Sequence, residues 1–219
     1  MNKFHRKYLK FPMGLFFSEN LSKVQIAFKL GLLWAVLEVT AAKFILYLNL
    51  DIKVTALTAL GVVILSFSLH RYQSPLLLAG IAMVATLLKR YGMPLLLLPS
   101  SINSSFAVLV LGLSLSLAAL IVMKIDQKKS WPQSQRFKLK LIIVSTSVLM
   151  SSFIFLKAGL LLAPCGYLLS FSGPGGTLSY FLKEALPWAL ISIFAFPIGA
   201  KLSRLLSVSF ASVHYSPME

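Results

Sequence analysis

Several charged and aromatic residues lie within or at the ends of long apolar stretches, where they could bind a polar ligand. An ionisable side chain inside a membrane span is costly, so a functional role is its default interpretation. Lysines at such positions could meet an anionic group, while tyrosine and tryptophan rings could stack on an apolar or aromatic body. The sequence therefore predicts a cavity for a small anionic or amphipathic molecule. The candidate residues are Glu38, Lys43, Asn49, Asp51, Lys157, Tyr180, Lys183, Glu184 and Trp188.

The same residues also have a purely structural interpretation. Glu38 and Lys157 could pair and neutralise each other, while the other lysines extend to the membrane interface and the aromatic rings form an interfacial belt. Tyr180, Glu184 and Trp188 recur every four residues and are expected to share one face of a helix. The residues alone leave both interpretations open.

The sequence contains no pattern typical of a catalytic or metal site. Catalysis would need a nucleophile beside a base, paired carboxylates or metal ligands at usable spacing. The 3 histidines and 6 acidic residues are instead scattered along the chain. The run 172–176, Ser-Gly-Pro-Gly-Gly, lacks the Lys and the Ser or Thr that complete a phosphate-binding loop. We therefore predict no enzyme activity, no metal, no cofactor and no ATPase activity in this chain.

The composition is that of a membrane protein. Of the 219 residues, 58% are hydrophobic and 12% are charged, and the mean hydropathy is +0.84. Such a chain is far more apolar than a soluble domain of this length. The net charge of +15 lies mostly between apolar stretches, where it indicates orientation in the membrane. We predict a multi-pass protein of the cell membrane that contacts lipid and does not bind nucleic acid. Its single cysteine, Cys165, excludes a disulfide within the chain.

Six apolar stretches predict an all-α integral membrane protein, with one membrane domain (1–219) in which 24–204 form a six-helix bundle. About 20 mostly apolar residues are needed to cross the hydrocarbon core. Segment 93–99, bracketed by Pro94 and Pro99, is too short to cross and is expected to be interfacial or re-entrant. The connector 166–180 contains a Gly-Pro-Gly-Gly turn. The expected spans are 24–50, 52–70, 76–88, 106–123, 141–164 and 182–200.

Positive charge is distributed unevenly between the two sides that six spans create. Most Lys and Arg fall in the N-terminal segment 1–23, in segment 124–140 and just after the last span, which all lie on one side. The positive-inside rule assigns that side to the cytoplasm. Both termini and the basic 124–140 loop are therefore predicted to be cytoplasmic. Segment 1–23 is expected to extend into the cytoplasm or to lie on the membrane surface.

The first span carries a stripe of small residues. Ala27, Gly31 and Ala35 follow at intervals of four and lie on one side of a helix. Small residues let another helix come close, and helices in lipid associate through such packing. Glu38 falls only about 20° from Ala27 around the same helix. The stripe is therefore predicted to dock a partner helix.

Together these features resemble the S components of energy-coupling factor transporters. The resemblance rests on six spans with both ends inside, the stripe at Ala27, Gly31 and Ala35, and the run from Tyr180 to Pro187 after a Gly/Pro loop. In that family a first-helix stripe, written AxxxAxxxA, packs on a coupling transmembrane subunit. Loops and helix ends on the outer side capture a vitamin or related micronutrient. The resemblance implies a substrate-binding subunit that depends on separate coupling and ATPase subunits.

Two other functions remain open. The chain could be a non-catalytic membrane scaffold or assembly subunit whose basic 124–140 loop recruits a cytoplasmic partner or anionic lipid. It could also be an integral-membrane enzyme of lipid or isoprenoid metabolism, because such enzymes can have sparse active sites. The ligand-contacting motifs of the biotin, riboflavin and thiamine S components are not matched, so the sequence does not identify a substrate.

The predicted topology can be tested by cysteine labelling after replacing the native Cys165 by serine. Cysteines at Lys129 and Lys140 should react only with reagents that reach the cytoplasm, because both positions lie in the basic loop. A cysteine at Gly175 should be labelled from outside. Labelling of position 129 by an impermeant maleimide in intact cells would overturn the orientation.

Overall fold

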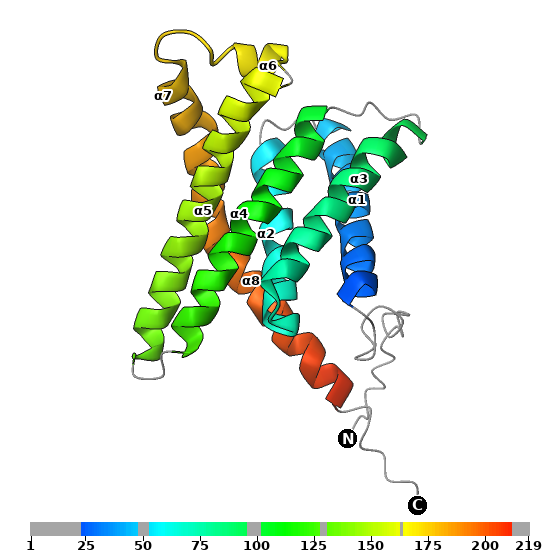
Figure 1. Ribbon diagram of the computed structural model, residues 1–219, viewed down its shortest axis with the longest axis vertical. Helices are drawn as coiled ribbons and strands as arrows, with labels where there is room; N and C mark the ends of the chain where they lie inside the picture. Colours follow the sequence, from blue (N-terminus) through cyan, green and yellow to red (C-terminus); the bar gives the residue numbers. More distant parts are fainter. Residues whose placement is uncertain (1–22, 48–52, 96–101, 128–130, 163, 212–219) are drawn as a thin grey trace, which may run out of the picture.

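The computed structural model describes residues 23–47, 53–95, 102–127, 131–162 and 164–211, and every regular element among them is helical (Figure 1). Between α5 and α8 lie the short helices α6 (Gly166–Leu169) and α7 (Gly176–Tyr180) and the π-helix η2 (Phe181–Ala185). The all-α prediction is confirmed for this part of the chain. The long helices are α1 (Lys23–Tyr47), α2 (Lys53–Tyr72), α3 (Pro75–Leu95), α4 (Ile102–Gln127), α5 (Gln133–Leu162) and α8 (Leu186–Ala211).

Five helical stretches are long and apolar enough to cross a membrane, and they comprise α1, α2, α4, α5 and the continuous run through α7, η2 and α8. A helix of about 20 residues spans roughly 30 Å, the thickness of the hydrocarbon core. Phe28, Leu117 and Phe194 on these helices are largely exposed. Such apolar outward surfaces suit contact with lipid tails, which are as apolar as the side chains. The described helices therefore have the character of a multi-pass membrane protein.

The long helices form a ring whose order differs from their order in the chain. Around the ring the neighbours are α1, α3, α4, α5, α8 and α2, and α2 returns to α1. The most extensive contacts are made by α2 with α8 and by α3 with α4. The ring is lined by elements far apart in sequence, because α1 and α8 come from opposite ends of the described chain (Figure 1).

Close helix crossings occur where one of the two helices carries a glycine. A Cβ added at Gly31 of α1 would lie 2.7 Å from the side chain of Val84 on α3. A Cβ at Gly112 of α4 would lie 2.0 Å from the Cβ of Ala82, and one at Gly199 of α8 would lie 2.3 Å from a backbone oxygen of α2. Helices in lipid associate largely through such close packing. Three of the ring's contacts therefore depend on the absence of a side chain.

The small-residue stripe of α1 packs against α3 of the same chain. Ala27, Gly31 and Ala35 are all buried, and the backbone of Gly31 is in close contact with α3. These residues are therefore not accessible to a coupling subunit in this arrangement, and internal packing accounts for their small size. The outward side of α1 carries large apolar residues instead, including Phe28 and Val36.

The third long helix differs from the prediction. The apolar pattern predicts a span that ends at 88 and a separate interfacial piece at 93–99. In the structure α3 continues as one helix through Lys89 and Arg90 to Leu95. Lys89, which follows the predicted end of that span, is therefore inside the bundle and buried. Residues 96–101 lie outside the described part of the chain.

The basic segment 124–140 is mostly helical rather than a long loop. α4 extends to Gln127 and α5 begins at Gln133, so the segment largely consists of helix ends. Helical bonding satisfies the backbone of these residues internally, and their charged side chains can extend to the interface. The Gly-Pro-Gly-Gly turn is confirmed, and Gly175 within it has a left-handed φ of 76°, a conformation that favours glycine.

More of the described basic residues lie towards one end of the bundle than towards the other. The more basic end is the one at which α1 begins, α8 ends and α4 meets α5, and α6 and α7 lie at the opposite end (Figure 1). The predicted N-terminal segment falls almost entirely outside the described residues. The described basic residues towards this end are Lys23, Arg71, Lys124, Arg136, Lys138, Lys140, Lys201 and Arg204.

The distances at the glycines predict that glycine-to-alanine substitutions will differ in their effect on stability. Gly112→Ala should destabilise the purified protein by about 1–3 kcal/mol, because the new methyl group overlaps the Cβ of Ala82. Gly80→Ala is the matched control, because its added Cβ would lie at an ordinary 3.4 Å from Ala27 and alanine favours the helix by up to about 1 kcal/mol. Unfolding in mixed micelles measures both. Equal stability of the two variants would contradict the close crossing.

Candidate functional site

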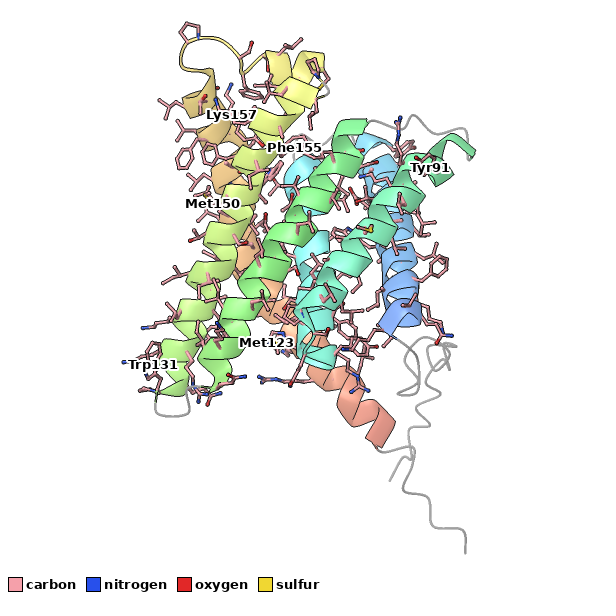
Figure 2. The ribbon with its side chains drawn as sticks, viewed as in Figure 1. Tyr91, Met123, Trp131, Met150, Phe155 and Lys157 are labelled. Carbon is pink, nitrogen blue, oxygen red and sulfur yellow. The ribbon has the colours of Figure 1, made fainter. Side chains whose placement is uncertain are left out.

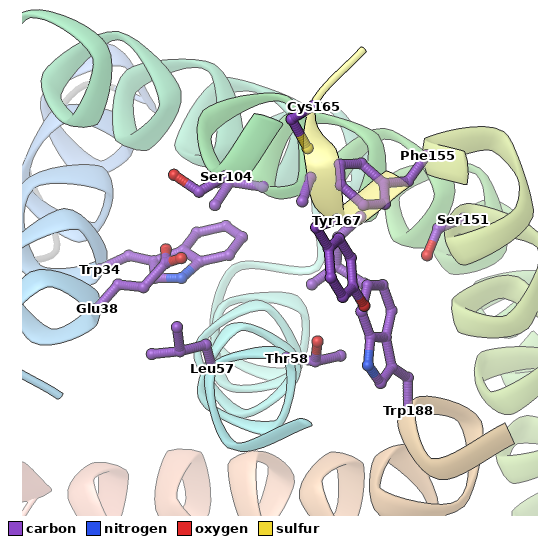
Figure 3. A pocket seen from close by; sticks show the side chains of 13 residues that line it. Trp34, Glu38, Leu57, Thr58, Ser104, Ser151, Phe155, Cys165, Tyr167 and Trp188 are labelled. Atoms are coloured by element: carbon purple, nitrogen blue, oxygen red, sulfur yellow. The ribbon is translucent and has the colours of Figure 1, made fainter. Parts of the chain in front are cut away.

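A cavity of about 310 Å³ lies inside the ring at the end opposite the basic helix ends. Its walls come from α1, α2, α4, α5 and α8, and α6 lies over it (Figure 3). The volume is at the lower end of the range typical of small-molecule sites. The lining residues are Trp34, Glu38, Leu57, Thr58, Ser104, Ala107, Val108, Leu111, Ser151, Phe155, Cys165, Tyr167 and Trp188.

One wall of the cavity carries a buried ion pair between α1 and α3. Lys89 donates a hydrogen bond to Oε1 of Glu38 and a longer one, at 3.4 Å, to the carbonyl oxygen of Ser104. The side chains of the pair are only 5% and 6% exposed. The second carboxylate oxygen, Oε2 of Glu38, has no hydrogen-bond partner among the described residues. The pair is neutral as a whole but leaves one strong acceptor at the cavity wall.

The remaining walls are dominated by aromatic rings. Trp34 lies beside Glu38 on α1, whereas Phe155, Tyr167 and Trp188 lie across the cavity (Figure 3). The rings of Phe155 and Trp188 are 6.3 Å apart, centroid to centroid. The indole nitrogens of both tryptophans are buried and have no partner among the described residues. The cavity is thus apolar in surface and has a few isolated polar atoms.

The cap formed by α6 is held in place by a series of aromatic contacts. Tyr167 packs edge to face on Phe171 at 5.4 Å, and Phe171 packs in the same way on Tyr180 at 5.2 Å. Tyr180 reaches Trp188 at 6.4 Å and donates a hydrogen bond to the carbonyl oxygen of Ser152 at 3.1 Å. Edge-to-face aromatic pairs are each worth about 0.5–1.5 kcal/mol beyond the area that they bury. The cap is therefore coupled to a cavity wall.

Tyr167 also contacts the π-helix. Burial raises the pKa of the Tyr167 hydroxyl above its ordinary value, and the nearby Glu184, to which that hydroxyl is hydrogen-bonded, raises it further. Tyr167 therefore stays protonated and can act as a donor. The two residues join α6 to η2 across the Gly-Pro-Gly-Gly turn.

The π-helix changes the expected face of the last membrane helix. A turn closed by an i to i+5 hydrogen bond holds about one residue more than an α-helical turn, so the residues before and after it no longer share the expected face, and π-turns are frequent at functional sites. Tyr180 and Trp188 are buried and in contact, whereas Glu184 is half-buried and Lys183 is exposed. The predicted single face of Tyr180, Glu184 and Trp188 is therefore only partly present. Tyr180 lies behind the cavity wall instead of lining it.

The predicted lysines are not brought to the cavity. Lys43, Lys157 and Lys183 are exposed and none is among the residues that line it. Figure 2 shows Lys157 near the end of α5 beside the α6–α7 region. The alternative pairing of Glu38 with Lys157 is wrong, because Glu38 pairs with Lys89. The predicted Asn49 and Asp51 lie outside the described residues.

Several residues of the site were not predicted, although the sequence held signals for Trp34, which lines the cavity, and for Lys89, which pairs with Glu38. Trp34 stands four residues before Glu38 on one helical face, well inside the span and away from the interface where tryptophan is common. A span ending at 88 has too few residues to cross a bilayer, so the helix had to continue past Lys89. Phe155, Tyr167 and Thr58 carried no local signal, because only the ring of helices brings them together.

The described residues around the cavity offer groups that can bind a small molecule. Among the described residues no group of three His, Cys, Asp or Glu side chains is placed to hold a metal ion. Its chemistry is that of a carboxylate acceptor, indole donors and aromatic surface. Comparisons with protein-family models, curated proteins and solved structures gave no match, so the function must be inferred from this chain's own geometry.

The ion pair predicts a strong dependence of stability on Lys89. Lys89→Met should destabilise the protein by about 3–5 kcal/mol, because it leaves a buried, unpaired carboxylate. Adding Glu38→Met should restore most of that loss, because an apolar pair of similar volume is often as stable as a buried ion pair. Unfolding in mixed micelles of the wild type, both single variants and the double variant gives the coupling energy.

Lys157→Met is the control, and its effect should stay within about 0.5 kcal/mol because the residue is exposed. A Lys89→Met variant as stable as Lys157→Met would show that the pair does not form. If Lys157→Met is instead destabilised and adding Glu38→Gln restores its stability, Glu38 pairs with Lys157 and the pair with Lys89 is contradicted.

Proposed function

We propose that this chain is the substrate-binding membrane subunit of an uptake transporter, and that it captures a small, largely apolar ligand in the cavity beneath α6. The observation that carries the proposal is the cavity itself, an aromatic-lined space inside the helix ring with unpartnered buried polar atoms. Ligand sites in proteins are typically concave and mostly apolar, with a few placed polar groups.

The position of the cavity supports capture from outside the cell. Basic residues gather at the opposite end of the bundle, and the positive-inside rule places such an end in the cytoplasm. We propose that α3, with its 21 residues, is a sixth span. Six spans place the start of α1 and the end of α8 on the same, cytoplasmic side. The cavity and its cap then face the outer side of the cell membrane.

Energy for uptake is proposed to come from separate coupling and ATPase subunits, as the resemblance to energy-coupling factor S components implies. The buried stripe at Ala27, Gly31 and Ala35 does not provide their docking surface in this arrangement. A coupling subunit would instead contact the outward side of the bundle. The proposed capture of a ligand does not depend on which helix it contacts.

Filling the cavity tests the proposal. Ala107 is half-buried and lines the cavity, so Ala107→Phe should place a ring in the ligand's space and lower the copurified small molecule at least tenfold. Native mass spectrometry of the protein released from mild detergent measures that occupancy. Leu113→Phe is the matched control, because it lies on the same helix but is 44% exposed.

Accessibility of the native thiol provides a second measurement. Cys165 lines the cavity and is partly buried, so an occupant should slow its reaction with N-ethylmaleimide, and Ala107→Phe should make that rate independent of the occupant. If wild type carries no small molecule and its thiol reacts at the same rate in membranes and after extensive washing, the cavity does not capture a ligand. A scaffold role would then be favoured.

A further inference from the structure

The unpartnered oxygen of Glu38 specifies part of the ligand. Oε2 is buried at the cavity wall and has no hydrogen-bond partner among the described residues, while Oε1 is held by Lys89. A buried polar atom without a partner is costly, so such atoms in native proteins call for an explanation. An ionised carboxylate is an acceptor only. The group that fits this oxygen is therefore an N–H or O–H donor on the ligand.

The charge balance of the wall argues for an uncharged ligand. Lys89 already neutralises Glu38, and the described residues that line the cavity include no further Lys, Arg, Asp or Glu. A charged ligand would lose its hydration on entering an apolar space and would meet no net opposite charge. This conclusion replaces the anionic ligand expected from Lys157 and Lys183, which are exposed and lie outside the cavity.

The aromatic walls define the rest of the ligand. Trp34 lies next to Glu38, and Phe155, Tyr167 and Trp188 face it across the cavity (Figure 3). Such rings offer flat apolar surface to a ligand placed between them. The donor group must lie at one edge of the apolar body, because Glu38 occupies only one side.

We propose that the ligand is an uncharged, apolar ring compound with an N–H or O–H group at its edge, and that this group donates to Oε2 of Glu38 while the ring lies between Trp34 and the opposite aromatic wall. The proposal rests on the capture function proposed above and names its ligand class. Lys89 is a positioning residue, because it engages Oε1 of Glu38 and leaves Oε2 without a partner among the described residues.

Matched probes test the donor group. Indole carries a ring N–H, 1-methylindole lacks it, indole-3-acetate adds a negative charge and tryptamine adds a positive one. Protection of Cys165 from N-ethylmaleimide by each probe gives its half-protecting concentration. Indole should protect at a concentration about tenfold or more below that of 1-methylindole, because a hydrogen bond to a charged acceptor is lost on methylation. Both charged probes should be at least tenfold weaker than indole.

The double variant Glu38→Met/Lys89→Met tests whether Glu38 accepts the hydrogen bond from the donor group of the probe. It removes the acceptor without leaving a buried unpaired charge. Indole and 1-methylindole should then protect Cys165 at about the same concentration. Val148→Ala/Leu156→Ala, which changes buried α5 residues outside the lining, should retain the preference for indole, because it leaves Glu38 in place.

The outcomes separate the ligand class from the capture function. Equal protection by indole and 1-methylindole in the wild type, an unchanged preference in Glu38→Met/Lys89→Met, or tighter binding of a charged probe would overturn the ligand class. If the copurified molecule is nevertheless lost in Ala107→Phe, capture stands and only the ligand class fails. If no probe protects Cys165 and Ala107→Phe displaces nothing, both proposals fail.

Discussion

The ion pair between Glu38 and Lys89 constrains the cavity more than any other contact. Two charges in a low-dielectric interior are tolerated only together, because removing either leaves a charge whose desolvation nothing offsets. The pair therefore fixes the position of α1 along α3. Both side chains are buried, and neither can move to water without breaking the ion pair. Trp34, one turn before Glu38, is placed at the cavity wall by the same constraint.

The cavity arises from a contrast in side-chain size along the ring. Where α3 crosses α1 and α4, the contacts at Gly31 and Gly112 leave no room even for a methyl group. Nearer the α6 end, Trp34, Phe155 and Trp188 come from three different helices. Large rings hold helices apart, and three rings cannot fill the space between them at the density of a protein interior. Close packing at one level and bulky rings at another leave a shaped void.

The sequence predicted the class of fold better than the site, and the reason is physical. Apolar stretch length and charge are local properties, so helices could be located from composition, and Glu38 and Trp188 could be selected as unusual residues within them. The partner of Glu38 depended on which helices are neighbours, which periodicity does not reveal. Lys157 was chosen because it lies within a span, yet the ring order places α3, not α5, beside Glu38. The burial of the stripe at Gly31 follows from the same neighbour relation.

A cavity of this kind separates the source of affinity from the source of selectivity. Aromatic surface removes apolar ligand area from water at about 25 cal/mol per Å² regardless of its substituents, so Trp34 and its opposing rings favour many ring compounds. Oε2 of Glu38 acts differently, because a ligand without a donor leaves this buried carboxylate oxygen without a hydrogen bond. Sites that present a buried polar group reject such analogues far more strongly than apolar pockets reject a change of size. Under the proposed capture function, one oxygen that has no partner among the described residues, because Lys89 engages only its neighbour, determines which of many apolar molecules stays bound.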